Sequence, residues 1–133
     1  MKKSILMLIL LFVALAGYSQ TASNTKTDFA VIEWASSAHD FGKIKQGVPV
    51  THEFKFTNKG TVPLIITNVA PSCGCTTPDW SREPVAPGKE GYIKATYNAA
   101  AQGAFSKSIT VTGNIENGST ILSIKGEVTT VVQ

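Results

Sequence analysis

Short apolar segments with a two-residue period, each followed by a turn signal, constrain this chain more than any other feature of its sequence. In VTHEFKFT (residues 50–57), three apolar residues and a histidine alternate with Thr, Glu and Lys. Successive side chains of a β-strand point to opposite faces, so this alternation predicts a half-buried strand. Across residues 20–133, apolar residues never recur at spacings of three and four for ten positions, and we expect no helix there.

Six further segments are also typical of strands: residues 29–34, 39–44, 62–69, 91–97, 105–113 and 119–128. Turn signals such as Pro87-Gly88 and Asn117-Gly118 separate them, and Asn-Gly is a strong hairpin signal. About seven strands in about a hundred residues predict an antiparallel, immunoglobulin-like β-sandwich. We expect six side chains to be buried between its two sheets: Phe54, Phe56, Ile66, Ile93, Ile109 and Ile124.

The first 19 residues have the composition of a secretory signal peptide. Two lysines precede an apolar run over residues 5–16, and the small residues Gly17 and Ser19 follow it. A membrane-spanning helix needs about 20 apolar residues, so the run fits a cleaved signal better than an anchor. We expect cleavage near Ser19/Gln20, export to the periplasm or the cell exterior, and no membrane span in the mature chain. Residues 20–28 would then form a flexible linker, and residues 29–133 the sandwich domain.

The charge pattern argues against a nucleic-acid partner. The formal net charge is +3, and removing Lys2 and Lys3 with the signal leaves +1. The remaining basic residues are scattered along the chain, whereas nucleic-acid binders concentrate them on one face. The chain also lacks the common motifs of nucleophilic, zinc-dependent and phosphate-binding enzymes, so we expect neither catalysis nor a cofactor.

Several stretches together resemble a known family: HDFGKIKQG, FKFTNKGTVPLIITNV, SCGCTTP, VAPGKEGYIKATYN, GAFSKSITVTGN and LSIKGEV. Over roughly residues 31–129, the chain is similar to the bacterial exported family catalogued as domain of unknown function 1573. That family looks like the immunoglobulin-like domains of the hydin and major-sperm-protein type. The resemblance implies a location in the bacterial envelope, with no established activity.

The two cysteines of the chain, Cys73 and Cys75, are separated by one glycine and leave three interpretations open. An oxidising compartment and a permissive Gly74 favour a disulfide, which would be easily reduced because its loop is so short. Alternatively, both thiolates bind a metal such as copper(I), with His39 and His52 as further candidate ligands. The third interpretation is a pair of packed, unbonded thiols.

These observations favour a non-catalytic module that binds other envelope proteins, by loop contacts or by addition of a strand to an exposed sheet edge. The alternative is a thiol-redox or copper(I)-handling protein that uses the Cys73-Gly74-Cys75 loop. The sequence does not decide between them.

Overall fold

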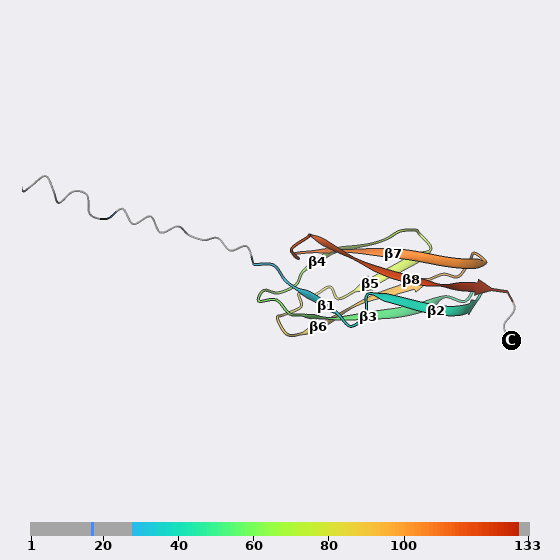
Figure 1. Cartoon of the computed structure of the whole chain (residues 1–133), viewed down its shortest axis with the longest axis horizontal. Helices are drawn as coiled ribbons and strands as arrows, with labels where there is room; N and C mark the ends of the chain where they lie inside the picture. Colours follow the sequence, from blue (N-terminus) through green and yellow to red (C-terminus); the bar gives the residue numbers. More distant parts are fainter. Residues whose placement is uncertain (1–16, 18–27, 131–133) are drawn as a thin grey trace, which may run out of the picture.

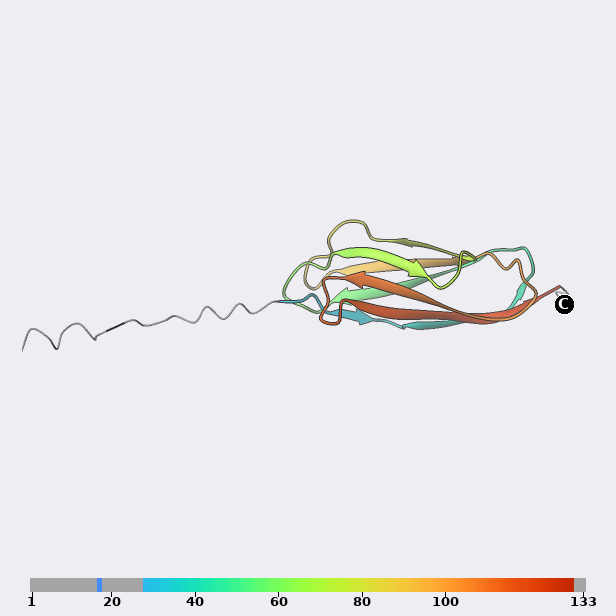
Figure 2. The same ribbon diagram turned by 90° about the horizontal axis from the view of Figure 1, so that it is seen from above.

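The computed structural model describes residue 17 and residues 28–130 of the 133-residue chain, and it contains two facing β-sheets (Figures 1 and 2). One sheet has the strand order β1-β3-β6-β5 and the other β2-β8-β7-β4. The strands are β1 (Ile32–Trp34), β2 (Ala38–Lys45), β3 (Val50–Asn58), β4 (Ile66–Pro71), β5 (Thr76–Trp80), β6 (Glu90–Tyr97), β7 (Gly103–Gly113) and β8 (Ser119–Thr129). The predicted all-β, immunoglobulin-like sandwich is confirmed, and no helix occurs in the described part of the chain.

The pairing of the strands is antiparallel with one exception. β2 runs parallel to β8, with Ala38 opposite Ser123 and Ile44 opposite Val128. The predicted antiparallel sandwich thus holds for every strand pair of the described residues except this one. The chain crosses from one sheet to the other after the short strand β1, and β2 then runs beside β8 in the same direction.

The core lies between the sheets and is made by the predicted alternating faces. Five of the six expected core residues are at most 2% exposed: Phe54, Phe56, Ile93, Ile109 and Ile124. Ile66 is only half-buried, which corrects the sixth prediction. The register between β4 and β7 shifts between Ile66 and Asn68, so Leu64 and Val69 supply the buried side chains of this segment.

One strand was missed in the sequence. β5 (Thr76–Trp80) carries Pro78 and Asp79, two residues that are typical of loops. It forms nevertheless, because it lies at the edge of its sheet and pairs only with β6. A proline is tolerated at an edge when its nitrogen faces away from the neighbouring strand.

Two positions require glycine, one for packing and one for a turn. Gly91 is buried on β6, where an added Cβ would lie 2.4 Å from the ring of Phe56, so only glycine lets this ring pack against the strand. Gly118 has a φ of +78° and occupies the turn between β7 and β8, as the Asn-Gly signal predicted. The turn spans residues 114–118 and is closed by the Gly118 N–H, which donates to the carbonyl of Ile115 at 2.9 Å.

The predicted signal peptide (residues 1–19) and nearly all of the predicted linker (residues 20–28) lie outside the described residues, apart from Gly17 and Asp28. Within the described part, no helix has the length and apolar character needed to cross a membrane. The described chain enters the sandwich at one end and leaves it at the other (Figures 1 and 2).

Candidate functional site

The first candidate site is the outer edge of β3, which its neighbour covers only in part. β1 pairs with the end of β3, from Trp34 opposite Phe56 to Ile32 opposite Asn58. One more hydrogen bond follows, in which the Ala35 N–H donates to the carbonyl of Lys55 at 3.0 Å. By Ser37 the chain has joined the other sheet, where the carbonyl of Ser37 accepts from the Ser123 N–H. The first half of β3 is thereby left without a neighbour on this side.

The direction of the backbone groups follows from the alternation of an antiparallel ladder. Lys55 bonds toward β1, so the N–H and C=O groups of Thr51 and Glu53 point the same way. The even-numbered residues between them, His52 and Phe54, bond toward β6. Within residues 28–130, no strand meets the backbone of Thr51 and Glu53 at this edge.

The other long edges are obstructed. In β5, the residues on either side of Pro78 bond to β6, so Pro78 occupies an outward-facing position that has no N–H to offer. Pro71 takes the equivalent outward position in β4, because Ser72 beside it bonds to Ser108 of β7. β2 is interrupted by a bulge between Asp40 and Lys43. Edge prolines and bulges are common devices against unwanted strand pairing, and the free stretch of β3 lacks both.

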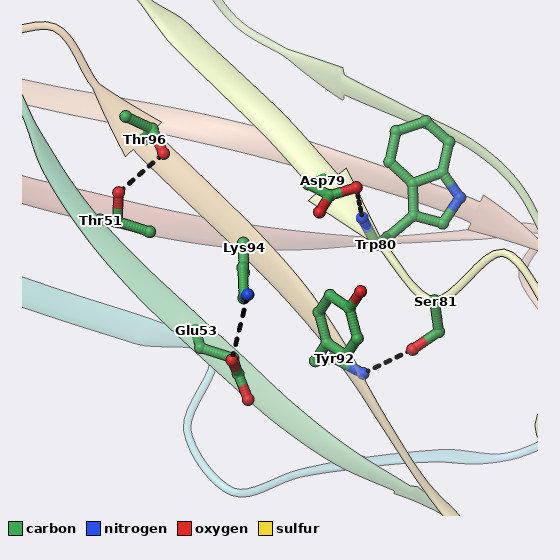
Figure 3. Close-up of polar contacts among 8 residues, drawn as sticks. All are labelled: Thr51, Glu53, Asp79, Trp80, Ser81, Tyr92, Lys94 and Thr96. Atoms are coloured by element: carbon green, nitrogen blue, oxygen red, sulfur yellow. Dashed lines mark hydrogen bonds and ion pairs between the residues drawn. The ribbon is translucent and has the colours of Figure 1, made fainter.

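The side chains of Thr51 and Glu53 do not cover the free edge. Figure 3 shows both on the outer face of the sheet, directed toward β6. The Thr51 hydroxyl lies 2.8 Å from that of Thr96, and the Glu53 carboxylate lies 3.9 Å from Nζ of Lys94 (Figure 3). Both contacts hold the side chains over the sheet, so the backbone groups at its edge stay open.

Behind this edge, two histidines close the interior between the sheets. The rings of His39 from β2 and His52 from β3 are stacked, with centroids 3.7 Å apart and planes 6° from parallel. Phe41 packs edge-on against His39, and Phe54 packs edge-on against His52, each with ring centroids 4.6 Å apart. Burial lowers the pKa of His52, the neighbouring His39 lowers it further, and the Glu53 carboxylate acts in the opposite direction.

The second candidate site is the loop between β4 and β5, where Cys73 and Cys75 are joined by a disulfide. Their α-carbons are 5.3 Å apart, and the Cys75 N–H donates to Sγ of Cys73 at 3.3 Å. Gly74 between them is exposed, with no atom within 4 Å of the position that a Cβ would take. The bond closes a loop of three residues and joins no two strands.

The structure does not gather the four candidate metal ligands into one site. The sulfurs of Cys73 and Cys75 are bonded to each other, and His39 and His52 face each other across β2 and β3 instead. Among the described residues, no three His, Cys, Asp or Glu side chains form a group that could hold a metal ion.

Sequence reasoning missed two features of the site region. Asn58 is followed by Lys59 and Gly60, a sequence typical of a turn, yet its side chain is fully buried and ties the loops at the end of β3 together. The sequence did contain a signal for this role, because Asn58 continues the buried face of β3 after Phe54 and Phe56. The free edge had no signal in the sequence, because it depends on where β1 leaves its sheet.

The two facing four-stranded sheets define an immunoglobulin-like module. It is similar to a protein of unknown function from Porphyromonas gingivalis (18% identity, TM-score 0.68, 81% of this chain and 51% of that one). It is also similar to the ASH/PapD-like domain 7 of human CEP192 (8% identity, TM-score 0.61, 88% and 97%). A third similar structure is the VesB protease of Vibrio cholerae (13% identity, TM-score 0.56, 74% and 31%). At these identities the likeness shows the fold alone.

The chain spans about half the length of the Porphyromonas gingivalis protein. No curated protein matches the sequence. A family model described as "Protein of unknown function (DUF1573)" matches residues 32–128. The chain therefore belongs to this family, which confirms the resemblance found in the sequence.

Proposed function

We propose that this chain is an exported, non-catalytic module that binds another protein of the cell envelope by taking up one of its segments as an added strand. The observation that carries the proposal is the free edge of β3 at Thr51 and Glu53. An added strand satisfies such backbone groups directly, and the side chains of the partner's segment then supply specificity.

The place of the partner segment follows from the pairing of β1. A segment running antiparallel to β3 would continue the line of β1 where the chain itself departs to the other sheet. Two residues with free N–H and C=O groups offer up to four backbone hydrogen bonds. Each contributes about 0.5–1.5 kcal/mol net, so the partner's side chains must provide much of the affinity.

Export supports an envelope partner. The apolar N-terminal run and the family resemblance both point to passage across the inner membrane. Two ion pairs lie on β3 and β2 and their neighbouring strands, Glu53 with Lys94 and Asp40 with Lys125 at 4.0 Å. Both pairs are exposed to solvent.

The test compares wild type with Glu53→Pro and Glu53→Ala. Proline at position 53 removes an edge donor and places its ring where the new strand would lie, whereas alanine keeps the backbone and removes only the side chain. From an extract of the producing cell's envelope, wild type and Glu53→Ala should retain the same protein, and Glu53→Pro should lose it.

Amide hydrogen exchange then locates the contact. With the retained protein bound, the amides of Thr51 and Glu53 should become protected from exchange. Equal retention by Glu53→Pro, or protection confined to other parts of the domain, would overturn strand addition at this edge.

A further inference from the structure

The Cys73–Cys75 disulfide does not contribute to the connections between strands that hold the fold. It closes a three-residue loop between two residues of the same connection. We infer that it is a redox-exchange site, opened by a pair of cysteine thiols on another exported protein. This inference does not depend on the binding proposed for β3.

The loop is held in place by contacts that do not involve sulfur. On one side, the Ser72 N–H donates to the carbonyl of Ser108 at 2.8 Å, and the Ser108 N–H donates to the Ser72 hydroxyl at 3.1 Å. On the other side, the Asn98 N–H donates to the carbonyl of Cys75 at 3.0 Å. Ser108 belongs to β7, and Asn98 directly follows β6 of the other sheet. The loop is therefore fixed to both sheets, and its two ends stay in place when the disulfide opens.

The loop is also open to a visiting thiol. Ser72 and Gly74 are exposed, and apart from its two neighbouring cysteines no residue comes within 4 Å of the position that a Cβ on Gly74 would take. Cys73 and Cys75 on either side of Gly74 are half-buried, so neither residue is closed off from solvent. Accessible disulfides that contribute little to stability are the labile, exchangeable ones, whereas buried structural disulfides resist reduction.

The two sulfurs are not equivalent. Sγ of Cys73 accepts a hydrogen bond from the Cys75 N–H at 3.3 Å, whereas Sγ of Cys75 has only a longer contact with the Thr76 hydroxyl, at 4.0 Å, and its side chain packs against the hydrophobic core. A hydrogen bond to sulfur stabilises the negative charge of a thiolate, and an apolar neighbour does not. Cys73 is therefore the better leaving group, and the attack falls on Cys75.

The exchange proceeds in two balanced steps. A thiolate of the partner attacks Sγ of Cys75, which forms a mixed disulfide and releases Cys73 as a thiolate. The partner's second thiolate then attacks the partner sulfur of that mixed disulfide and releases Cys75. Two electrons and the two protons of the partner's thiols pass to Cys73 and Cys75, and the partner leaves with a disulfide.

The first test is a glutathione redox series on the full mature protein, with thiols counted by alkylation and intact mass. We expect the disulfide to open within the range that mixtures of reduced and oxidised glutathione cover, and to close again when the ratio is reversed. A bond that stays closed throughout that range would overturn the inference, because it would behave as a structural clamp.

The second test separates the two sulfurs. Cys75→Ser keeps Cys73 with its hydrogen bond from the backbone, and Cys73→Ser keeps Cys75. At neutral pH we expect iodoacetamide to modify Cys73 in the first variant several-fold faster than Cys75 in the second. Equal or reversed rates would overturn the assignment of Cys73 as the leaving group.

Two control variants distinguish failure of the redox inference from failure of the strand addition proposed for β3. Glu53→Pro should leave the glutathione series unchanged, since β6 lies between β3 and β5, the strand that follows the cysteine loop. The double variant Cys73→Ser/Cys75→Ser should in turn retain the same envelope protein as wild type. Failure of one proposal thus leaves the other standing.

Discussion

The side chain of Asn58 is 0% exposed and has four hydrogen bonds to backbone groups. Its amide donates to the carbonyls of Val62 at 2.8 Å and Val85 at 2.9 Å. Its oxygen accepts from the N–H groups of Gly60 at 2.9 Å and Val31 at 3.4 Å. One residue thereby joins the start of β1 to the loops that follow β3 and precede β6.

We expect Asn58→Ala to lower the free energy of unfolding by about 3 kcal/mol, since each buried group left unpaired costs about 1–3 kcal/mol. Asn114→Ala is the matched control. That side chain also bonds two backbone groups, at Ile65 and Pro63, but it is only half-buried and water can replace it. Urea unfolding of both variants gives the comparison, and an equal loss for the two would contradict the role assigned to burial.

The lowered pKa of His52 makes stability depend on pH. The unfolded chain protonates this histidine near its ordinary pKa of about 6.5, at a higher pH than the folded chain does. The stability linked to His52 is therefore complete above about pH 6.5 and is lost as the pH falls through the folded-state pKa. We expect a lower free energy of unfolding at pH 5.5 than at pH 7.5.

His52→Gln removes the titrating group and should flatten this dependence. The other charged groups near the stacked rings are Glu53 with Lys94, and Asp40 with Lys125. Urea midpoints at the two pH values decide the matter, and an unchanged slope in His52→Gln would place the pH dependence elsewhere.

At the scale of the strands, the free edge of β3 predicts that proline is tolerated at one member of an ion pair and not at the other. Glu53 lies on the open edge, whereas its partner Lys94 lies opposite it on β6, between β3 and β5. Glu53→Pro and Lys94→Pro both remove the ion pair. Only the second also removes an N–H that bonds to β5.

We therefore expect Glu53→Pro to cost about 1 kcal/mol and to leave the domain folded. Lys94→Pro should cost at least about 3 kcal/mol, because proline inside a sheet removes a ladder bond and conflicts with the neighbouring strand. Thermal melts followed by circular dichroism give both values. Similar losses would show that the edge at Glu53 is covered after all.

At the scale of the whole molecule, the sandwich is expected to stand without its disulfide. A three-residue loop has little chain entropy to lose, so closing it contributes no more than about 2 kcal/mol. Cys73→Ser/Cys75→Ser should keep the fold and lower the free energy of unfolding by no more than that amount. Chemical denaturation measures the difference, and collapse of the double variant would assign the bond a structural role.

The sequence predicts the features of the fold that neighbouring residues determine, and it misses those that depend on contacts between distant strands. The alternation of apolar and polar residues in β3 correctly predicted which of its faces is buried, as Phe54 and Phe56 show. Such an alternation is a property of adjacent residues and can be found in the sequence alone. β5 was missed because the local signal of Pro78 concealed its edge position. The pairing of His39 with His52 could not be found, because it arises from the approach of two sheets whose contact has no trace in either strand.

The parallel pairing of β2 with β8 has a mechanical consequence. Because the described chain enters and leaves at opposite ends of the sandwich, tension between those ends first acts on the three residues of β1. It then pulls β2 and β8 along their length in opposite directions. The evenly spaced bonds of a parallel ladder are loaded together under such shear, whereas the bonds of a hairpin peeled from one end break in succession. A domain of this topology that is pulled at its two ends would therefore resist force best along its long axis.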